Sequence, residues 1–180
     1  MSLPRKDLAR ATAIASLYIQ ALRAGETFWF KVVSGSMVPT LNIGDRVRIE
    51  PVTAQDIHKG EIAAFETDHG LVIHRIVRKE IQGMDVRLLE MGDVDLRAKW
   101  VEAKAVVGRV ALVHHDAMEI DLRHPIAKRC GTVTAYLRYR LYLLHTNKKF
   151  ATFQVAVRKC SRLAVRAGYW CIRISSVSRV

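Results

Sequence analysis

The sequence predicts an α+β protein with an antiparallel β-barrel or folded-ribbon core, an N-terminal amphipathic helix and C-terminal basic helices. Two observations lead to this fold class. Apolar residues recur with a helical period before residue 28, alternate along short runs between residues 28 and 113, and return to a helical period afterwards. Half of the 180 residues are hydrophobic, which is enough for a packed core. We therefore expect three parts, at residues 1–27, 28–121 and 122–180.

Residues 7–24 carry the predicted N-terminal helix. Their apolar side chains recur at intervals of three and four residues, and Gly25 follows where a helix often ends. We expect this helix to pack against the β domain, and the alternative is a free membrane anchor. Its uncharged run, residues 11–22, is shorter than the roughly 20 residues that a membrane-spanning helix needs. Neither a transmembrane segment nor a secretory signal is evident.

The central part, residues 28–121, is a series of short strands joined by Gly, Asp and Pro turns. Val47 and Ile49 alternate with charged residues in a half-buried strand that Pro51 stops. The turn TDHG joins two further strands into a hairpin, and a second turn follows at QGMD. The expected strands are FWFKVV (28–33), RVRIE (46–50), EIAAFE (61–66), LVIHRIVRKEI (71–81), VRLLEM (86–91) and AVVGRVALVH (105–114).

Two basic helices are expected after Pro125, where the composition changes. Each has one apolar face, and the second also has arginines spaced by four residues on the opposite face. The first apolar face comprises Val133, Leu137, Leu141 and Leu144; the second comprises Phe150, Phe153, Val157, Cys160 and Ala164; the basic stripe comprises Arg158, Arg162 and Arg166.

Charge is divided unevenly along the chain. Residues 1–121 contain 16 Lys/Arg and 17 Asp/Glu, a net charge of −1, whereas residues 122–180 contain 13 Lys/Arg and no acidic residue, a net charge of +13. A basic module of this kind attracts polyanions. We expect residues 124–180, with the basic stripe, to contact an anionic membrane surface, which places the protein peripherally at the cytoplasmic face.

Other roles for the basic module stay open. It is also consistent with a helical pair packed on the β domain, or with a docking surface for an acidic partner. The sequence has no RNA-binding aromatic motif and no zinc finger, so no specific nucleic acid is expected. Its three cysteines, Cys130, Cys160 and Cys171, have neither CxxC nor metal-ligand spacing. We therefore expect no disulfide framework, no metal and no other cofactor, and a reducing compartment.

A pair of serines is the first candidate for chemistry. Ser36 follows a strand and begins a turn made compact by Gly35 and Pro39, which presents its hydroxyl at a strand end. A serine becomes nucleophilic when a base takes its proton and donors hold the oxyanion. Ser34 lies on the same side of an extended segment, so its hydroxyl is a candidate oxyanion donor. The alternative is a serine-rich turn without catalytic function.

His74 and two aspartates are the second candidate. His74 lies within an apolar strand, and histidine is the side chain best suited to act as a base near neutral pH. Asp93 and Asp95 follow the next strand and are placed to orient an imidazole. The alternatives are a buried core histidine with satisfied hydrogen bonds and ordinary turn aspartates.

These segments, in order and spacing, resemble the conserved boxes of the signal peptidase I-like serine peptidases over about residues 28–113. The matching segments are SGSMVPTLNIGD (34–45), GEIAAF (60–65), LVIHRIV (71–77), MGD (91–93) and VVGRVALV (106–113). The resemblance implies the β core shared by signal peptidases and SOS-repressor peptidases. It also implies Ser36 as nucleophile, Ser34 as side-chain oxyanion donor and His74 as general base, as in archaeal and endoplasmic-reticulum-type members. Met37 and Pro39, from the nucleophile box, are expected to contact the substrate.

The third catalytic member stays open. Asp93 matches the aspartate of the third box, but Asp95 replaces the usual asparagine and Lys99 stands where a later aspartate is usual. Asp93 or Asp95 serves as the acid, or a Ser–His dyad suffices. The N-terminal transmembrane anchor usual in the family is missing, and the basic module is not part of the family core.

The function implied is a serine endopeptidase that hydrolyses a peptide bond in a leader or signal-type peptide. The reaction runs through a Ser36 acyl-enzyme with His74 as general base. One alternative is a self-cleaving SOS-repressor-type peptidase, which shares the fold but uses lysine as base. The other is a non-catalytic polyanion- or membrane-surface-binding protein on a peptidase-like scaffold.

Overall fold

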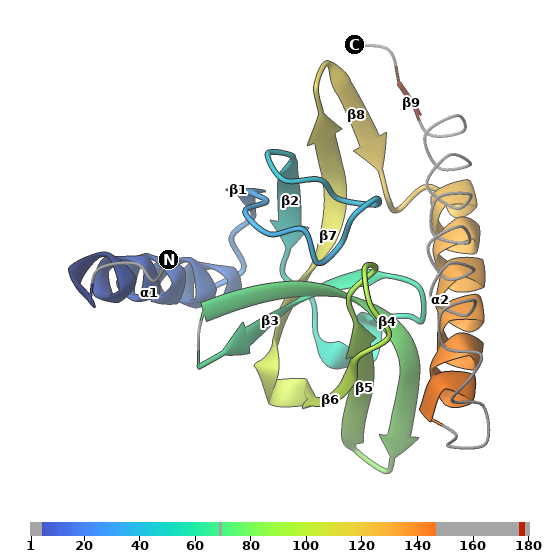
Figure 1. Cartoon of the computed structure of the whole chain (residues 1–180). Coiled ribbons are helices and arrows are strands. Elements are labelled where there is room, and N and C mark those ends of the chain that lie inside the picture. Colours follow the sequence, from blue (N-terminus) through green and yellow to red (C-terminus); the bar gives the residue numbers. More distant parts are fainter. Residues whose placement is uncertain (1–4, 69, 147–176, 179–180) are drawn as a thin grey trace.

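The computed structural model of the protein describes residues 5–68, 70–146 and 177–178, which form the predicted α+β fold. Nine strands make one antiparallel sheet in this part of the chain, and two α-helices flank it (Figure 1). The predicted fold class is confirmed. The second predicted C-terminal helix, with its apolar face and with Arg158, Arg162 and Arg166, lies outside the described residues.

The elements follow one another along the chain with short connections. They are α1 (Arg5–Arg23), β1 (Phe28–Lys31), β2 (Arg46–Glu50), the 3₁₀ helix η1 (Ala54–Asp56), β3 (Ile62–Thr67), β4 (Gly70–Gln82), β5 (Asp85–Met91), β6 (Ala98–Glu102), the 3₁₀ helix η2 (Ala103–Ala105), β7 (Val106–His115), β8 (Met118–Asp121), α2 (Pro125–Thr146) and β9 (Val177–Ser178).

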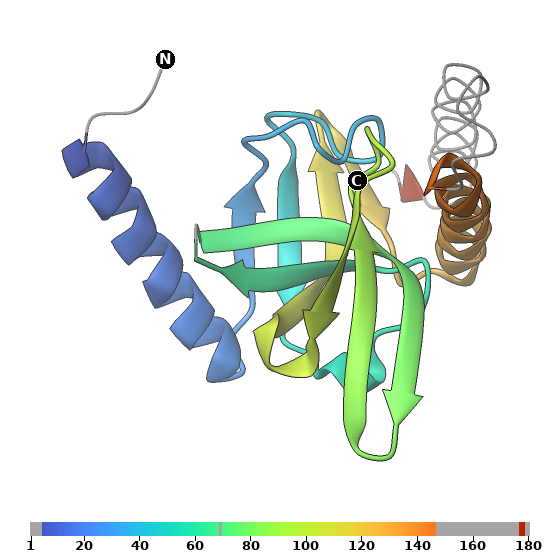
Figure 2. The same ribbon diagram turned by 60° about the horizontal axis from the view of Figure 1, so that its bottom comes forward.

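The sheet has the strand order β1-β2-β7-β3-β4-β5-β6, with β8 pairing with β7 and β9. It curls into a half-barrel, as Figure 2 shows. Register shifts in the β2–β7, β3–β7 and β4–β5 pairs assist the curling, since a bulge bends and twists a strand locally. Consecutive strands β3, β4, β5 and β6 pair in sequence, so the two hairpins that carry His74 and residues 90–95 lie side by side.

Besides β9, which has two residues, two short strands were not expected from the sequence, β6 and β8. Each of these contains two charged residues and has only four or five residues. β6 ends the strand order, where it has one neighbour, and short, charged strands are typical of such an edge. The period-2 signal of these segments is weak because so little of each is buried.

The two helices lie on opposite sides of the sheet (Figures 1 and 2). Helix α1 buries Ile19 and Leu22 in the main core, and Tyr18 makes edge-to-face contacts with Phe28 and Phe30 of β1. The predicted N-terminal helix therefore packs on the β domain. No helix in the described part of the chain is both long and apolar enough to cross a membrane.

Helix α2 packs on the sheet through small and polar residues. Its most buried positions are Ala127, Gly131, Thr134, Ala135 and Arg138. The predicted apolar face of this helix contacts the core only in part: Leu141 packs against a core cluster, whereas Val133 is 58% exposed and Leu144 is 43% exposed. The leucine spacing thus predicted a helix but not the face that contacts the β domain.

Candidate active site

Ser36 lies in a loop that joins β1 to β2 and is held at its base and its middle. At the base, two backbone hydrogen bonds join the two ends of the loop. Val32 N–H donates to Asp45 O at 2.8 Å, and Gly44 N–H donates to Val32 O at 2.9 Å. In the middle, the side chains of Met37 and Leu41 are 2% and 1% exposed and belong to the main core. The loop therefore presents Ser36 from a fixed support.

The two serine hydroxyls lie next to each other. Ser34 Oγ and Ser36 Oγ are 3.4 Å apart, where the chain bends at Gly35 and enters a turn at Ser36. Ser34 is exposed and Ser36 is half-buried. The Ser36 carbonyl accepts a hydrogen bond from Val94 N–H at 3.0 Å, which joins the β1–β2 loop to the turn at residues 92–95.

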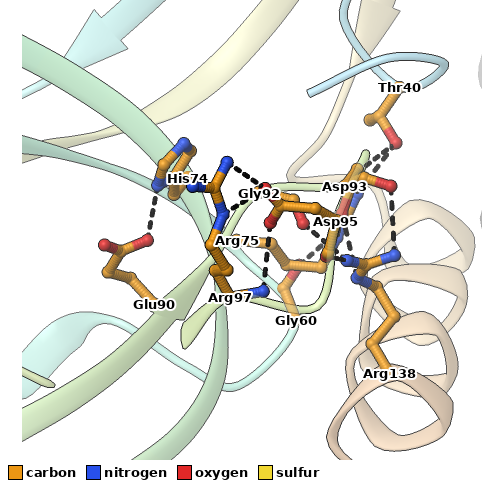
Figure 3. A network of polar contacts seen from close by, with 10 residues as sticks. All are labelled: Thr40, Gly60, His74, Arg75, Glu90, Gly92, Asp93, Asp95, Arg97 and Arg138. Carbon is orange, nitrogen blue, oxygen red and sulfur yellow. Dashed lines mark hydrogen bonds and ion pairs between the residues drawn. The ribbon is translucent and has the colours of Figure 1, made fainter. Parts of the chain in front are cut away.

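His74 has two different neighbours for its two ring nitrogens (Figure 3). Nδ1 is hydrogen-bonded to the carboxylate of Glu90 on the paired strand β5. Nε2 faces Gly92: a Cβ atom placed on Gly92 lies 3.4 Å from His74 Nε2 and 2.9 Å from the Ser36 carbonyl oxygen. The imidazole and the Ser36 backbone thus converge on the same point.

No hydrogen bond joins Ser36 to His74 among the residues that the structure describes; each makes the contact given above. Catalytic hydrogen bonds are often long before substrate binds and shorten in the complex. The His74 side chain is 21% exposed and that of Glu90 is 12% exposed, so both side chains are partly accessible to solvent.

Glu90 was missed by sequence reasoning. Glu90 pairs with Ile76 in the β4–β5 register, so the two side chains lie on the same face of the sheet. His74 lies two residues before Ile76 in β4 and therefore shares that face. The available signal was a carboxylate in the largely buried second half of the strand DVRLLEM, whose hairpin register is fixed by the turn at Gly83. Pairing Glu90 with His74 requires the β4–β5 register, which cannot be read from either strand alone.

Asp93 is fully buried and bonded to other groups. Its carboxylate accepts hydrogen bonds from Arg75 Nε at 2.9 Å, Arg75 Nη2 at 2.7 Å and Thr40 Oγ1 at 2.6 Å. Burial raises the pKa of Asp93, but the charges of Arg75 and Arg138 and the hydrogen bonds from Arg75 and Thr40 together hold that pKa below its usual range. Asp95 instead binds Arg97, at 2.8 Å to its Nε. In the described structure, neither aspartate is hydrogen-bonded to His74.

The buried network ties three functional segments together. Thr40 belongs to the β1–β2 loop, Arg75 follows His74 in β4, and Asp93 follows Gly92. Arg75 also donates to the Gly60 carbonyl at 2.9 Å. Since Arg75 and His74 point to opposite faces of β4, the ion pair fixes the strand behind the imidazole. Asp93 thereby fixes the positions of Thr40 and Arg75, on the face of β4 opposite His74.

The other expected contact residues have different surroundings. Met37 packs in the core, whereas Pro39 is partly exposed; Val33 and Ile43, on the same loop, are 82% and 66% exposed. A cavity of about 290 Å³ adjoins Glu90, and Val72, on the His74 face of β4, lines it too. In the described residues, no group of three or more His, Cys, Asp or Glu side chains is arranged to hold a metal ion.

One comparison with known proteins gave a match. The model of a family described as Peptidase S24-like matches residues 6–111, which include Ser36, His74, Glu90 and Asp93 and end before α2. No curated protein matches the chain.

Proposed function

The chain belongs to the Peptidase S24-like family, which points to a serine-type peptidase, and from this premise we propose that Ser36 is its nucleophile, His74 its general base and Glu90 the carboxylate that orients His74. One observation carries the proposal: Glu90 holds Nδ1 of His74 while Nε2 faces the Ser36 backbone across Gly92. A nucleophile–base–acid triad has the same order of groups, with glutamate here as the acid, and rotation of the Ser36 hydroxyl toward Nε2 would complete it.

The proposed mechanism places the protons as follows. With a carboxylate on Nδ1, the proton of a neutral imidazole resides on Nδ1, and the lone pair of Nε2 faces the serine. Ser36 Oγ attacks the scissile carbonyl carbon as Nε2 takes its proton. The same proton then passes to the leaving amine as the C–N bond breaks, which leaves an acyl-enzyme. Water, deprotonated by Nε2, hydrolyses the ester and restores Ser36.

Ser34 completes the proposed mechanism. Rotation of the Ser36 side chain toward the imidazole releases the Ser34 hydroxyl, which then donates to the oxyanion together with the Ser36 N–H. Preorganised donors of this kind contribute on the order of 10²–10³-fold to rate.

The substrate we propose is a leader or signal-type peptide bound in an extended conformation. It binds by main-chain hydrogen bonds along a strand edge near Ser36 and Pro39. The cavity beside Glu90 accepts one side chain of the peptide, since Val72 and Phe65 give it an apolar wall. Small residues on the acyl side of the cut follow from the family resemblance.

We also propose that the basic module, residues 124–180, holds the enzyme peripherally at an anionic membrane surface at the cytoplasmic face. Its support is the +13 net charge of residues 122–180. Within the described part of this module, Arg129 and Arg140 are exposed on α2.

Covalent labelling by a fluorophosphonate probe tests the catalytic proposal. In the wild-type chain, Ser36 Oγ is expected to displace fluoride from the probe and to carry the phosphonyl group, which peptide mass spectrometry identifies. Ser36→Ala and His74→Ala are expected to abolish labelling. His58→Ala is the matched control, because His58 is 74% exposed in its side chain and lies outside the site. Undiminished labelling of Ser36→Ala contradicts the assignment of the nucleophile.

A further inference from the structure

Arg138 is a charged residue with no exposed surface in the middle of α2. Its guanidinium reaches the turn at residues 92–95 and donates to three backbone carbonyls (Figure 3). Nη1 donates to Asp93 O at 3.0 Å, and Nη2 donates to Gly92 O at 2.6 Å and to Asp95 O. Burial of a whole guanidinium is unfavourable unless its hydrogen bonds and charge are compensated, so these contacts need an explanation.

Charge pairing alone does not explain Arg138. The carboxylate within ion-pair distance of Arg138 is that of Asp93, which already binds Arg75 through two nitrogens. Arg138 Nε lies 3.8 Å from Asp93 and has no hydrogen-bond partner in the described part of the chain. Burial lowers the pKa of Arg138, and the charge of Asp93 offsets this only in part. The strongest contacts of Arg138 are therefore those to the backbone of one turn.

That turn is the part of the chain that touches both proposed catalytic residues. Gly92 lies against His74 Nε2 and against the Ser36 carbonyl, and Val94 N–H donates to the same carbonyl. Arg138 binds the carbonyl of Gly92 itself and the carbonyls of Asp93 and Asp95, the two neighbours of Val94. Displacement of the turn changes the separation of Ser36 and His74.

Helix α2 is itself fixed against the site by close backbone packing. A Cβ atom on Gly60 would lie 2.4 Å from Thr132 N, and one on Gly131 would lie 2.7 Å from Gly60 O. The same Gly60 carbonyl accepts the hydrogen bond from Arg75. Thr132 Oγ1 adds a hydrogen bond to Lys59 O at 3.2 Å. This packing fixes the position of α2, and therefore of Arg138, relative to the 92–95 turn.

We propose that Arg138 is a positioning residue that sets the Ser36–His74 separation by holding the 92–95 turn, so that α2 completes the active site although it lies outside the family match. This inference rests on the proposed function. A guanidinium suits the task because its planar fork reaches several carbonyls at once, which an ammonium group on a flexible stem does not.

The test compares the rate of fluorophosphonate labelling per reactive site in Arg138→Lys and Arg138→Met. We expect about a tenfold slower rate for Lys and a loss on the order of 10²-fold for Met, since small displacements of reacting groups have effects of this size. Misfolding lowers the labelled fraction but not the rate of the labelled molecules. Arg140→Ala is the control, because Arg140 is exposed on the same helix and is expected to label at the wild-type rate.

Chemical rescue strengthens the test. Methylguanidinium added to Arg138→Ala is expected to restore part of the rate, because it replaces the group that holds the carbonyls. Wild-type rates in both Arg138→Lys and Arg138→Met overturn the inference.

A failure of the proposed function is recognised separately, by absence of Ser36-dependent labelling in the wild-type chain. The effect of Arg138 on the 92–95 turn is then measured by hydrogen exchange at the amides of Val94 and Asp95. Faster exchange in Arg138→Met than in Arg140→Ala supports a turn held by Arg138, and equal exchange overturns it.

Discussion

At the residue scale, the carboxylate that binds His74 is not one of those that the sequence motifs predict. A carboxylate on Nδ1 fixes the tautomer and stabilises the imidazolium that forms when Nε2 takes a proton. Glu90 occupies this position, and Asp93 is engaged by Arg75 on the other face of β4. Substitutions of the two carboxylates should therefore have different consequences.

Glu90→Gln is expected to slow labelling and peptide hydrolysis by roughly 10²–10⁴-fold, because an amide no longer stabilises the imidazolium and permits the wrong tautomer. The measurement is the labelling rate of Ser36 as a function of pH, together with the urea midpoint. Glu26→Gln serves as control, since Glu26 is exposed in the connection between α1 and β1 and does not line the cavity beside Glu90. A Glu90→Gln chain that labels as fast as the control contradicts the proposed role of Glu90.

The residues differ in how far the sequence predicted them. Ser36, Ser34 and His74 stand out because their signals are local: a turn after a strand, an i, i+2 spacing and a histidine within an apolar run. Glu90 and Arg138 depend on which strands and helices meet. One needs the β4–β5 register and the other the docking of α2, and neither follows from a single segment.

At the scale of the elements, the same limit explains the helices and strands. Alternation predicted the long strands of the sheet but missed β6 and β8, whose short, charged segments have little buried surface. Helix α2 shows a leucine pattern on one face, yet it contacts the β domain through Gly131, Ala135 and Arg138. Small residues allow a closer approach than leucines, which is what the Gly60–Gly131 contact requires.

Gly131→Ala tests this contact between elements. Alanine favours a helix over glycine by about 1 kcal/mol, so a gain in stability is expected if the site has room. The structure leaves none: the new Cβ meets the Gly60 carbonyl at 2.7 Å. We therefore expect a net loss of about 1–3 kcal/mol in the free energy of unfolding, measured by urea denaturation. Stabilisation by Gly131→Ala would show that α2 is not seated as described.

The Arg75–Asp93 pair makes stability depend on pH. Because the pKa of Asp93 lies below its usual value of 3.8, its ionised form stabilises the fold at pH values above 3.8, and this contribution is lost as pH falls through the lower folded-state pKa. At pH 7, Asp93→Asn is expected to cost about 3–5 kcal/mol, since it leaves a buried guanidinium unpaired.

The difference in unfolding free energy between wild type and Asp93→Asn should then decrease below pH 4, as the wild-type carboxylate becomes protonated. Urea midpoints at pH 7 and at successively lower pH values measure it. The exposed Asp116→Asn is the reference substitution, with a side chain that is 85% exposed. A difference that stays constant across this range contradicts an ionised, stabilising Asp93.

At the scale of the whole molecule, the charge asymmetry separates catalysis from localisation. The proposed catalytic residues lie in the part of the chain with a net charge of −1, and the basic stripe lies in the part with +13. Arg138 joins the two, because α2 supplies both a buried support for the 92–95 turn and the start of the basic module. Removing the module entirely therefore disturbs the site, and substitutions within it are the cleaner probe.

The membrane proposal predicts that the full-length chain sediments with vesicles of phosphatidylserine and phosphatidylcholine but not with phosphatidylcholine alone. Each cation near an anionic surface contributes about 1 kcal/mol, so replacing Arg158, Arg162 and Arg166 together by Gln should weaken binding by about two orders of magnitude. The matched control replaces three exposed cations of the β domain, Arg97, Lys99 and Lys104, by Gln. Because both triple variants lose the same charge, equal weakening would mean that net charge alone attracts the vesicles. Weakening confined to the first variant, with Ser36 labelling in solution unchanged, supports a surface contact made by the basic stripe.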